Sequence, residues 1–169
     1  MIIYKDIISD DELISDSFPI KEVDGIVYEV DCAMITIGAV QVDIGANASA
    51  EEQEEAVEDQ EQKVNNIIHS FNLQQTGFDK KGYVNYLKGY MKAVKSKLQE
   101  AGKSADEIKA FETGAQAFAK KIIANFADYE FYTGEKMNVD GMVVLLNYRE
   151  DGVTPYVTYW KHGLREEKV

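Results

Sequence analysis

The side chains that most often perform covalent or metal chemistry are scarce in this sequence. It has two histidines, His69 and His162, without neighbours at metal-binding spacing, and one cysteine, Cys32. A single cysteine forms neither an internal disulfide nor a cysteine-based zinc site. Because Cys32 lies in an apolar, strand-like stretch, we expect a buried, inert thiol. Phosphate-binding loops, dinucleotide fingerprints and nucleophile elbows are also missing. The sequence therefore predicts a protein that is not an enzyme and requires no cofactor.

Three consecutive carboxylates, Asp10, Asp11 and Glu12, lie near the N-terminus. Composition favours a solvated turn or a helix N-terminus, where negative charge is well tolerated. Carboxylate oxygens also bind calcium, but the twelve-residue spacing of an EF-hand loop is missing. Any calcium binding is therefore expected to be weak, and the sequence does not identify its ligands.

Charge is distributed unevenly along the 169 residues, whose formal net charge is -12. Residues 51–62 contain seven acids and no Lys or Arg, whereas residues 78–126 contain ten lysines and five acids. The overall negative charge argues against specific DNA binding, because phosphates are repelled at long range. A locally cationic surface can nevertheless bind an acidic partner.

Four of these lysines, Lys81, Lys88, Lys92 and Lys95, line one face of a predicted helix. We call them the lysine row. Such a row usually keeps a helix face soluble. The alternative is a docking surface for acidic polymers such as tubulin tails or ribosomal RNA, and the charge asymmetry supports it.

The segment over residues 76–126 has the pattern of two helices. In the first, apolar residues recur at steps of three and four, and Gly102 follows as a helix stop. Ser104 and Glu107 then form a capping box that begins the second helix. Because the connection is short, we expect an antiparallel helical hairpin. The predicted buried faces comprise Tyr83, Leu87, Tyr90, Val94 and Leu98, then Ile108, Phe111, Ala115, Phe118 and Ile122.

Strand-forming sequence flanks the hairpin on both sides, over residues 1–45 and 127–169. Asp-Gly pairs at 24–25, 140–141 and 151–152 predict tight turns, because both residue types tolerate positive φ. The chain is thus predicted to be a single α+β domain, residues 1–169, in which a helical hairpin is inserted into an all-β body. Residues 46–63, which lack a core-facing apolar stripe, are expected to form a mobile acidic loop.

The chain shows no pattern of export or membrane insertion. Acids interrupt the start, MIIYKDIISDDE, where a signal peptide keeps an apolar core. No run approaches the ~20 apolar residues of a membrane span. We therefore expect a cytoplasmic protein.

Several stretches together resemble one protein family. They are MIIYKDIISDDE at 1–12, IGANASAE at 44–51, TGFDKKGYVNYLKGYMKAVKSKL at 76–98 and FADYEFYTGEKMNVDGMVVLLNYREDGVTPY at 126–156. They resemble the translationally controlled tumour protein (TCTP) family nearly end to end, with a composition similar to fungal members. The resemblance implies a β-tent or sandwich like that of the Mss4 exchange proteins, with a helical hairpin and a flexible acidic loop.

The resemblance also implies function. Family members are described as cytoplasmic proteins that associate with microtubules and the cytoskeleton, bind calcium, interact with ribosomes and elongation factors, and protect against stress and cell death. They are also proposed to regulate the small GTPase Rheb, and Glu12 matches the proposed GTPase-contact glutamate. Two hypotheses follow: a binding protein that uses the lysine row, and a regulator of a Rheb-like GTPase that uses Glu12.

Overall fold

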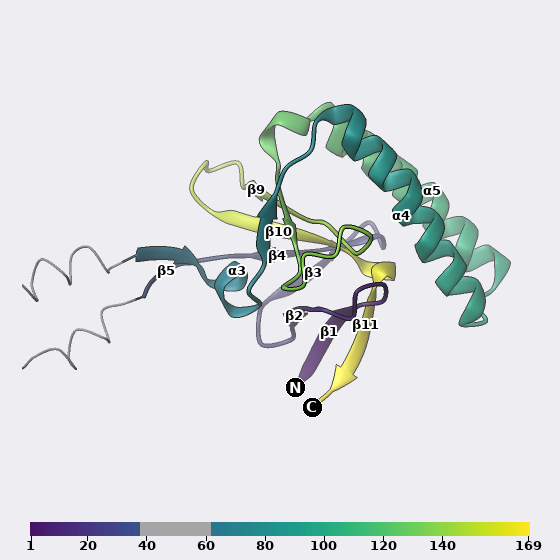
Figure 1. Ribbon diagram of the computed structural model, residues 1–169, viewed down its shortest axis with the longest axis horizontal. Helices are drawn as coiled ribbons and strands as arrows, with labels where there is room; N and C mark the ends of the chain where they lie inside the picture. The colour runs from purple at the N-terminus through teal and green to yellow at the C-terminus, as the bar shows by residue number, and fades with distance from the viewer. Residues whose placement is uncertain (38–61) are drawn as a thin grey trace, which may run out of the picture.

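The computed structural model describes residues 1–37 and 62–169 (Figure 1). Most of the predicted acidic loop, 46–63, therefore lies outside the described residues. Its last two residues do not: Gln62 and Lys63 lie in a strand, β6 (Gln62–Asn65), which pairs antiparallel with β5 (Met34–Ile37). The strand thus begins two residues inside the segment that the sequence assigned to the loop.

The two ends of the chain build the sheets together. The first sheet has the order β11-β1-β2, which places the two termini side by side (Figure 1). The second has the order β3-β4-β10-β9-β8-β7, so a strand from the first 31 residues lies next to one from the last 15. The bounds are β1 Ile2–Asp6, β2 Glu12–Ser15, β3 Ile20–Val23, β4 Val27–Asp31, β7 Gln74–Thr76, β8 Glu130–Thr133, β9 Val144–Tyr148, β10 Pro155–Trp160 and β11 Leu164–Lys168.

The helical hairpin is formed by α4 (Lys80–Glu100) and α5 (Ala105–Ala124), which run side by side away from the strands (Figure 1). The ten predicted buried residues are the ones the structure buries in these helices. Gly102 has φ +78°, and Ser104 Oγ accepts the Glu107 amide at 3.1 Å, as a helix stop and an N-cap require. The α+β prediction is confirmed. Short elements between residues 65 and 77 were not predicted: α3 (Asn66–Ser70) and β7.

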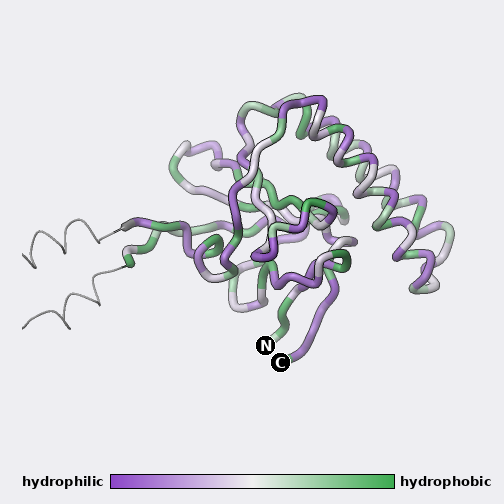
Figure 2. The backbone as a smooth tube through the Cα atoms, in the orientation of Figure 1, coloured by the Kyte–Doolittle hydropathy of each residue, from purple (hydrophilic) through white to green (hydrophobic). Residues whose placement is uncertain are grey.

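One face of the hairpin packs on the β body through aromatic contacts. The Phe118 ring meets Trp160 edge-on at 5.6 Å between centroids, and Phe111 lies 4.9 Å from the His162 ring. His162 belongs to the short helix η2 (Lys161–Gly163), which links β10 to β11; a second such turn, η1 (Phe126–Asp128), follows α5. Hydrophilic and hydrophobic residues alternate along both helices (Figure 2). The face of the hairpin opposite these aromatic contacts is therefore turned away from the sheets.

Two of the three predicted Asp-Gly turns are confirmed. Asp24 and Gly25 have φ of 55° and 69° between β3 and β4, and Gly152 has φ 71° between β9 and β10. The third, at 140–141, is confirmed only in part: the Gly141 amide donates to the Asn138 carbonyl oxygen at 3.1 Å, so the chain turns there. This turn lies within a ten-residue connection, 134–143, and Gly141 does not adopt positive φ, so it is not a tight hairpin turn. Gly141 is needed there for space: a Cβ on it would lie 2.6 Å from Asp6 Oδ2.

Within residues 1–37 and 62–169, no helix combines the length and the apolar character required to cross a bilayer.

Candidate docking surface

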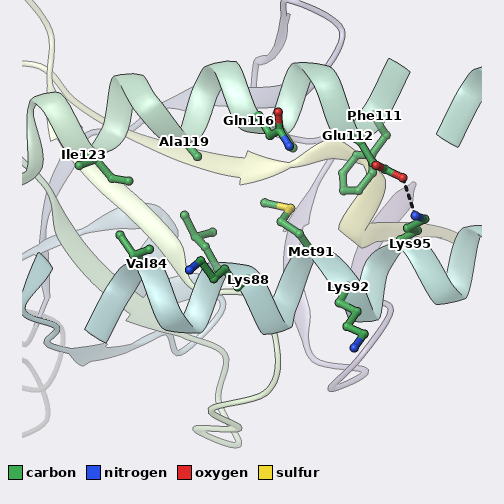
Figure 3. A pocket seen from close by; sticks show the side chains of 12 residues that line it. Val84, Lys88, Met91, Lys92, Lys95, Phe111, Glu112, Gln116, Ala119 and Ile123 are labelled. Carbon is green, nitrogen blue, oxygen red and sulfur yellow. Dashed lines mark ion pairs between the residues drawn. The ribbon is translucent and has the colours of Figure 1, made fainter. Parts of the chain in front are cut away.

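A groove of about 360 Å³ follows the seam between α4 and α5 on the outer face of the hairpin (Figure 3). It exists because each helix presents a second periodic stripe beside its buried face. On α4 the stripe is at positions 84, 88, 91 and 95, and on α5 at 112, 116, 119 and 123. Its apolar lining comprises Val84, Leu87, Met91, Phe111, Ala115, Ala119 and Ile123, and its polar lining Lys88, Lys92, Lys95, Glu112 and Gln116.

Three members of the lysine row, Lys88, Lys92 and Lys95, line this groove, whereas Lys81 does not. Lys81, Lys88 and Lys92 are exposed, and Lys95 is partly exposed. In Figure 3, Lys92 extends from the outer edge of α4, away from α5. The predicted row is therefore solvent-accessible, as a docking surface requires.

The charges of the row are only partly neutralised. Lys95 Nζ lies 2.9 Å from Glu112 Oε1, and this ion pair joins the two helices near one end of the groove (Figure 3). For Lys81, Lys88 and Lys92, no carboxylate of the described residues lies within 4 Å. Glu112 was not anticipated from the sequence, although its position one helix-turn before Gln116 in the second stripe is a detectable signal.

The three N-terminal carboxylates do not act together. Asp10, at φ 67°, forms an ion pair with Arg165, and this guanidinium lowers the pKa of the exposed Asp10 carboxyl. Asp11 is buried, and its Oδ1 lies 3.9 Å from Lys136 Nζ. Glu12 is exposed at the start of β2, opposite Lys5 of β1. A turn rather than a helix N-terminus is confirmed, but the expectation that it is solvated is wrong for Asp11.

Calcium binding remains a prediction. No group of three or more His, Cys, Asp or Glu side chains in the described ranges is placed to share a metal ion, and this includes the carboxylates at 10–12. The acids of residues 51–61 lie outside those ranges.

The cysteine and the two histidines, the residue types most often used in catalysis, differ in their surroundings. Cys32 is 7% exposed, and burial raises the pKa of its thiol to about 11, so it stays protonated at neutral pH. The prediction of a buried thiol is confirmed. Burial, followed by the charge of Lys161, lowers the pKa of His162. His69 is exposed on α3.

A buried carboxylate that was not predicted from the sequence, Asp6, fixes the turn that precedes Glu12. Asp6 accepts hydrogen bonds from the Ile8 amide at 2.8 Å, from Ser9 Oγ at 2.9 Å and from the Met142 amide at 2.6 Å. The last of these joins the turn at 6–11 to the connection between β8 and β9. Asp6 thus has a structural role.

Comparison with known proteins gives consistent similarities. A family model described as translationally controlled tumour protein matches residues 1–165. The chain is 72% identical over its whole length to the translationally-controlled tumor protein homolog of Neurospora crassa, and 69% identical to that of Gibberella zeae, with complete coverage of both relatives.

Solved structures of proteins from the same family have a similar fold. The Schizosaccharomyces pombe translationally controlled tumor-associated protein p23fyp matches with a TM-score of 0.84 at 55% identity, and covers all of both chains. The Caenorhabditis elegans structure of the translationally-controlled tumor protein, determined by NMR, matches with a TM-score of 0.71 at 29% identity, over 100% of this chain and 99% of that one.

Proposed function

Because this chain belongs to the translationally controlled tumour protein family, we propose that it is a non-enzymatic binding protein of the cytoplasm that associates with microtubules and with the translation machinery, ribosomes or elongation factors. The observation that supports this function most directly is the lysine row. It lies on a hairpin that extends beyond the sheets, and Lys81, Lys88 and Lys92 are exposed.

Electrostatic attraction gives this surface its selectivity. Residues 78–126 carry a formal charge of +5 in a chain of net charge -12, so an acidic partner is attracted to the hairpin and repelled by the remainder. Exposed charge pairs contribute little individually and are screened over about 8 Å at physiological salt. Several lysines must therefore act together.

The lysine row can be tested by replacing Lys81, Lys88, Lys92 and Lys95 together by glutamine. We expect the affinity for polymerised tubulin, measured by co-sedimentation, to fall by about tenfold or more, and wild-type binding to weaken as salt rises. The matched control replaces Lys97, Lys103, Lys109 and Lys120 by glutamine, which removes the same charge from elsewhere on the hairpin. An equal loss in both variants, or no loss in the first, would remove the lysine row from the mechanism.

A second function, regulation of a Rheb-like small GTPase, is supported by the position of Glu12. Its side chain is exposed, while the turn before it is held from inside by Asp6. A nucleotide-exchange factor needs no covalent chemistry, because it acts by stabilising the nucleotide-free GTPase. A carboxylate at the start of a strand, directly after a fixed turn, can repel the bound phosphates or bind a lysine of the GTPase.

This second function predicts that wild-type protein accelerates release of a fluorescent guanine nucleotide from a purified Rheb-like GTPase, and that Glu12→Ala does not. Glu166→Ala is the matched control, because Glu166 is an exposed carboxylate on β11 of the same sheet. Equal release rates with wild type, with Glu12→Ala and with buffer would exclude exchange activity at this site.

A further inference from the structure

We propose that the groove between α4 and α5 binds one amphipathic, acidic α-helix of a partner protein. This inference rests on the proposed function, since it specifies the kind of acidic partner that the lysine row receives. It also goes beyond charge, because it requires apolar side chains on the partner.

The lining of the groove supplies the first argument. Val84, Met91, Ala119 and Ile123 are half-exposed along the outer seam, above side chains that are already buried. A surface that bound a flexible acidic tail by charge alone would not require these apolar side chains. An amphipathic helix covers such a stripe with side chains at i, i+3, i+4 and i+7.

The shape of the groove supplies the second argument. The small side chains of Ala115 and Ala119 lower the α5 wall, and Met91 on α4 is flexible enough to adapt to an incoming side chain. From Val84 to Lys95 the α4 wall spans about 16 Å, which is the length of three helical turns. A third helix can therefore lie along the seam and contact both walls.

The positive charge at the edge of the groove indicates that the bound helix is acidic. Lys88 and Lys92 stand on the α4 edge, and the Lys95–Glu112 ion pair lies near the end towards the hairpin tip (Figure 3). A partner helix with Asp or Glu beside its apolar stripe meets these lysines. The hairpin of a second copy of this chain fits poorly, because each hairpin segment carries a formal charge of +5 and the two would repel.

The test uses two synthetic peptides of about five helical turns and equal negative charge. One carries leucine at i, i+3, i+4 and i+7 with glutamate beside it, and the other has serine in place of every leucine. We expect fluorescence anisotropy to show that the full-length protein binds the leucine peptide at least about tenfold more tightly.

Matched variants locate the binding. Ala119→Gln places a polar side chain in the groove and should weaken binding of the leucine peptide by about tenfold. Ala117→Gln, an exposed position on the same helix outside the groove, should leave it unchanged. Neither change should affect the serine peptide.

The outcomes separate the two proposals. If both peptides bind equally and Ala119→Gln has no effect, the groove inference is overturned. The proposed function of the lysine row would still hold if the variant with glutamine in place of these four lysines bound tubulin more weakly than wild type does. If the leucine peptide binds but Ala117→Gln weakens it as much as Ala119→Gln, the groove is not its site, and the inference is again overturned.

Discussion

Replacement of Asp6 by alanine is expected to lower the free energy of unfolding by about 3 kcal/mol or more, the largest effect that we predict for a single side chain. Asp6 is 1% exposed and accepts three hydrogen bonds. Its removal leaves the buried amide of Met142 and the partly buried amide of Ile8 without this acceptor, and unpaired buried donors are costly. Urea denaturation followed by circular dichroism measures the change.

Two further variants control this prediction. Asp6→Asn keeps an acceptor oxygen and the side-chain volume, so we expect a smaller loss than for alanine. Asp16→Ala removes an exposed carboxylate just after β2, and should change stability by no more than about 0.5 kcal/mol. If Asp6→Ala is as stable as wild type, the three hydrogen bonds do not hold the turn at 6–11 in place.

Tyr86→Phe is expected to destabilise the protein by about 2 kcal/mol. The Tyr86 hydroxyl donates to the Gly141 carbonyl oxygen at 2.6 Å and accepts from the Val143 amide at 2.9 Å. These two bonds tie α4 to the connection that also receives Asp6. The loss of one oxygen atom therefore leaves two backbone groups unpaired, and thermal or urea unfolding should report it.

Tyr90, one helical turn further along α4, provides the matched control. Its hydroxyl is buried and has no hydrogen-bond partner among the side chains and backbone of residues 1–37 and 62–169. The burial of an unpaired hydroxyl is unfavourable, so Tyr90→Phe should leave stability unchanged or raise it by about 1 kcal/mol. Equal destabilisation by the two Phe variants would show that the hydroxyl contacts of Tyr86 are not the source of its effect.

The helical hairpin was predictable in detail because its determinants are local. Periodicity selects the buried face of each helix, and Gly102 and Ser104 set the boundary through backbone conformation and capping. The same locality made the turns at 24–25 and 151–152 predictable. It was insufficient at 140–141, where the chain turns but does not form the predicted tight hairpin, and where Gly141 packs against Asp6, which is remote in sequence.

The candidate site was predictable only in part. The lysine row was identified from spacing, since exposure of a helix face follows from burial of the opposite one. The groove was not, because it needs the register of α4 against α5, which brings Val84 beside Ile123 and Lys95 beside Glu112 (Figure 3). No single helix contains that information.

The sequence by itself determined the family, the α+β class, the hairpin with its two buried faces, and the exposed lysines, because these depend on composition and on contacts between near neighbours in the chain. The tertiary structure alone decided that Asp11 is buried while Glu12 is exposed, and that Asp6 joins segments 136 positions apart. It also decided that two polar-edged helices enclose an apolar groove. The reason is physical: the burial and pairing of a side chain are properties of what packs against it, and in these cases the packing partner is remote in sequence.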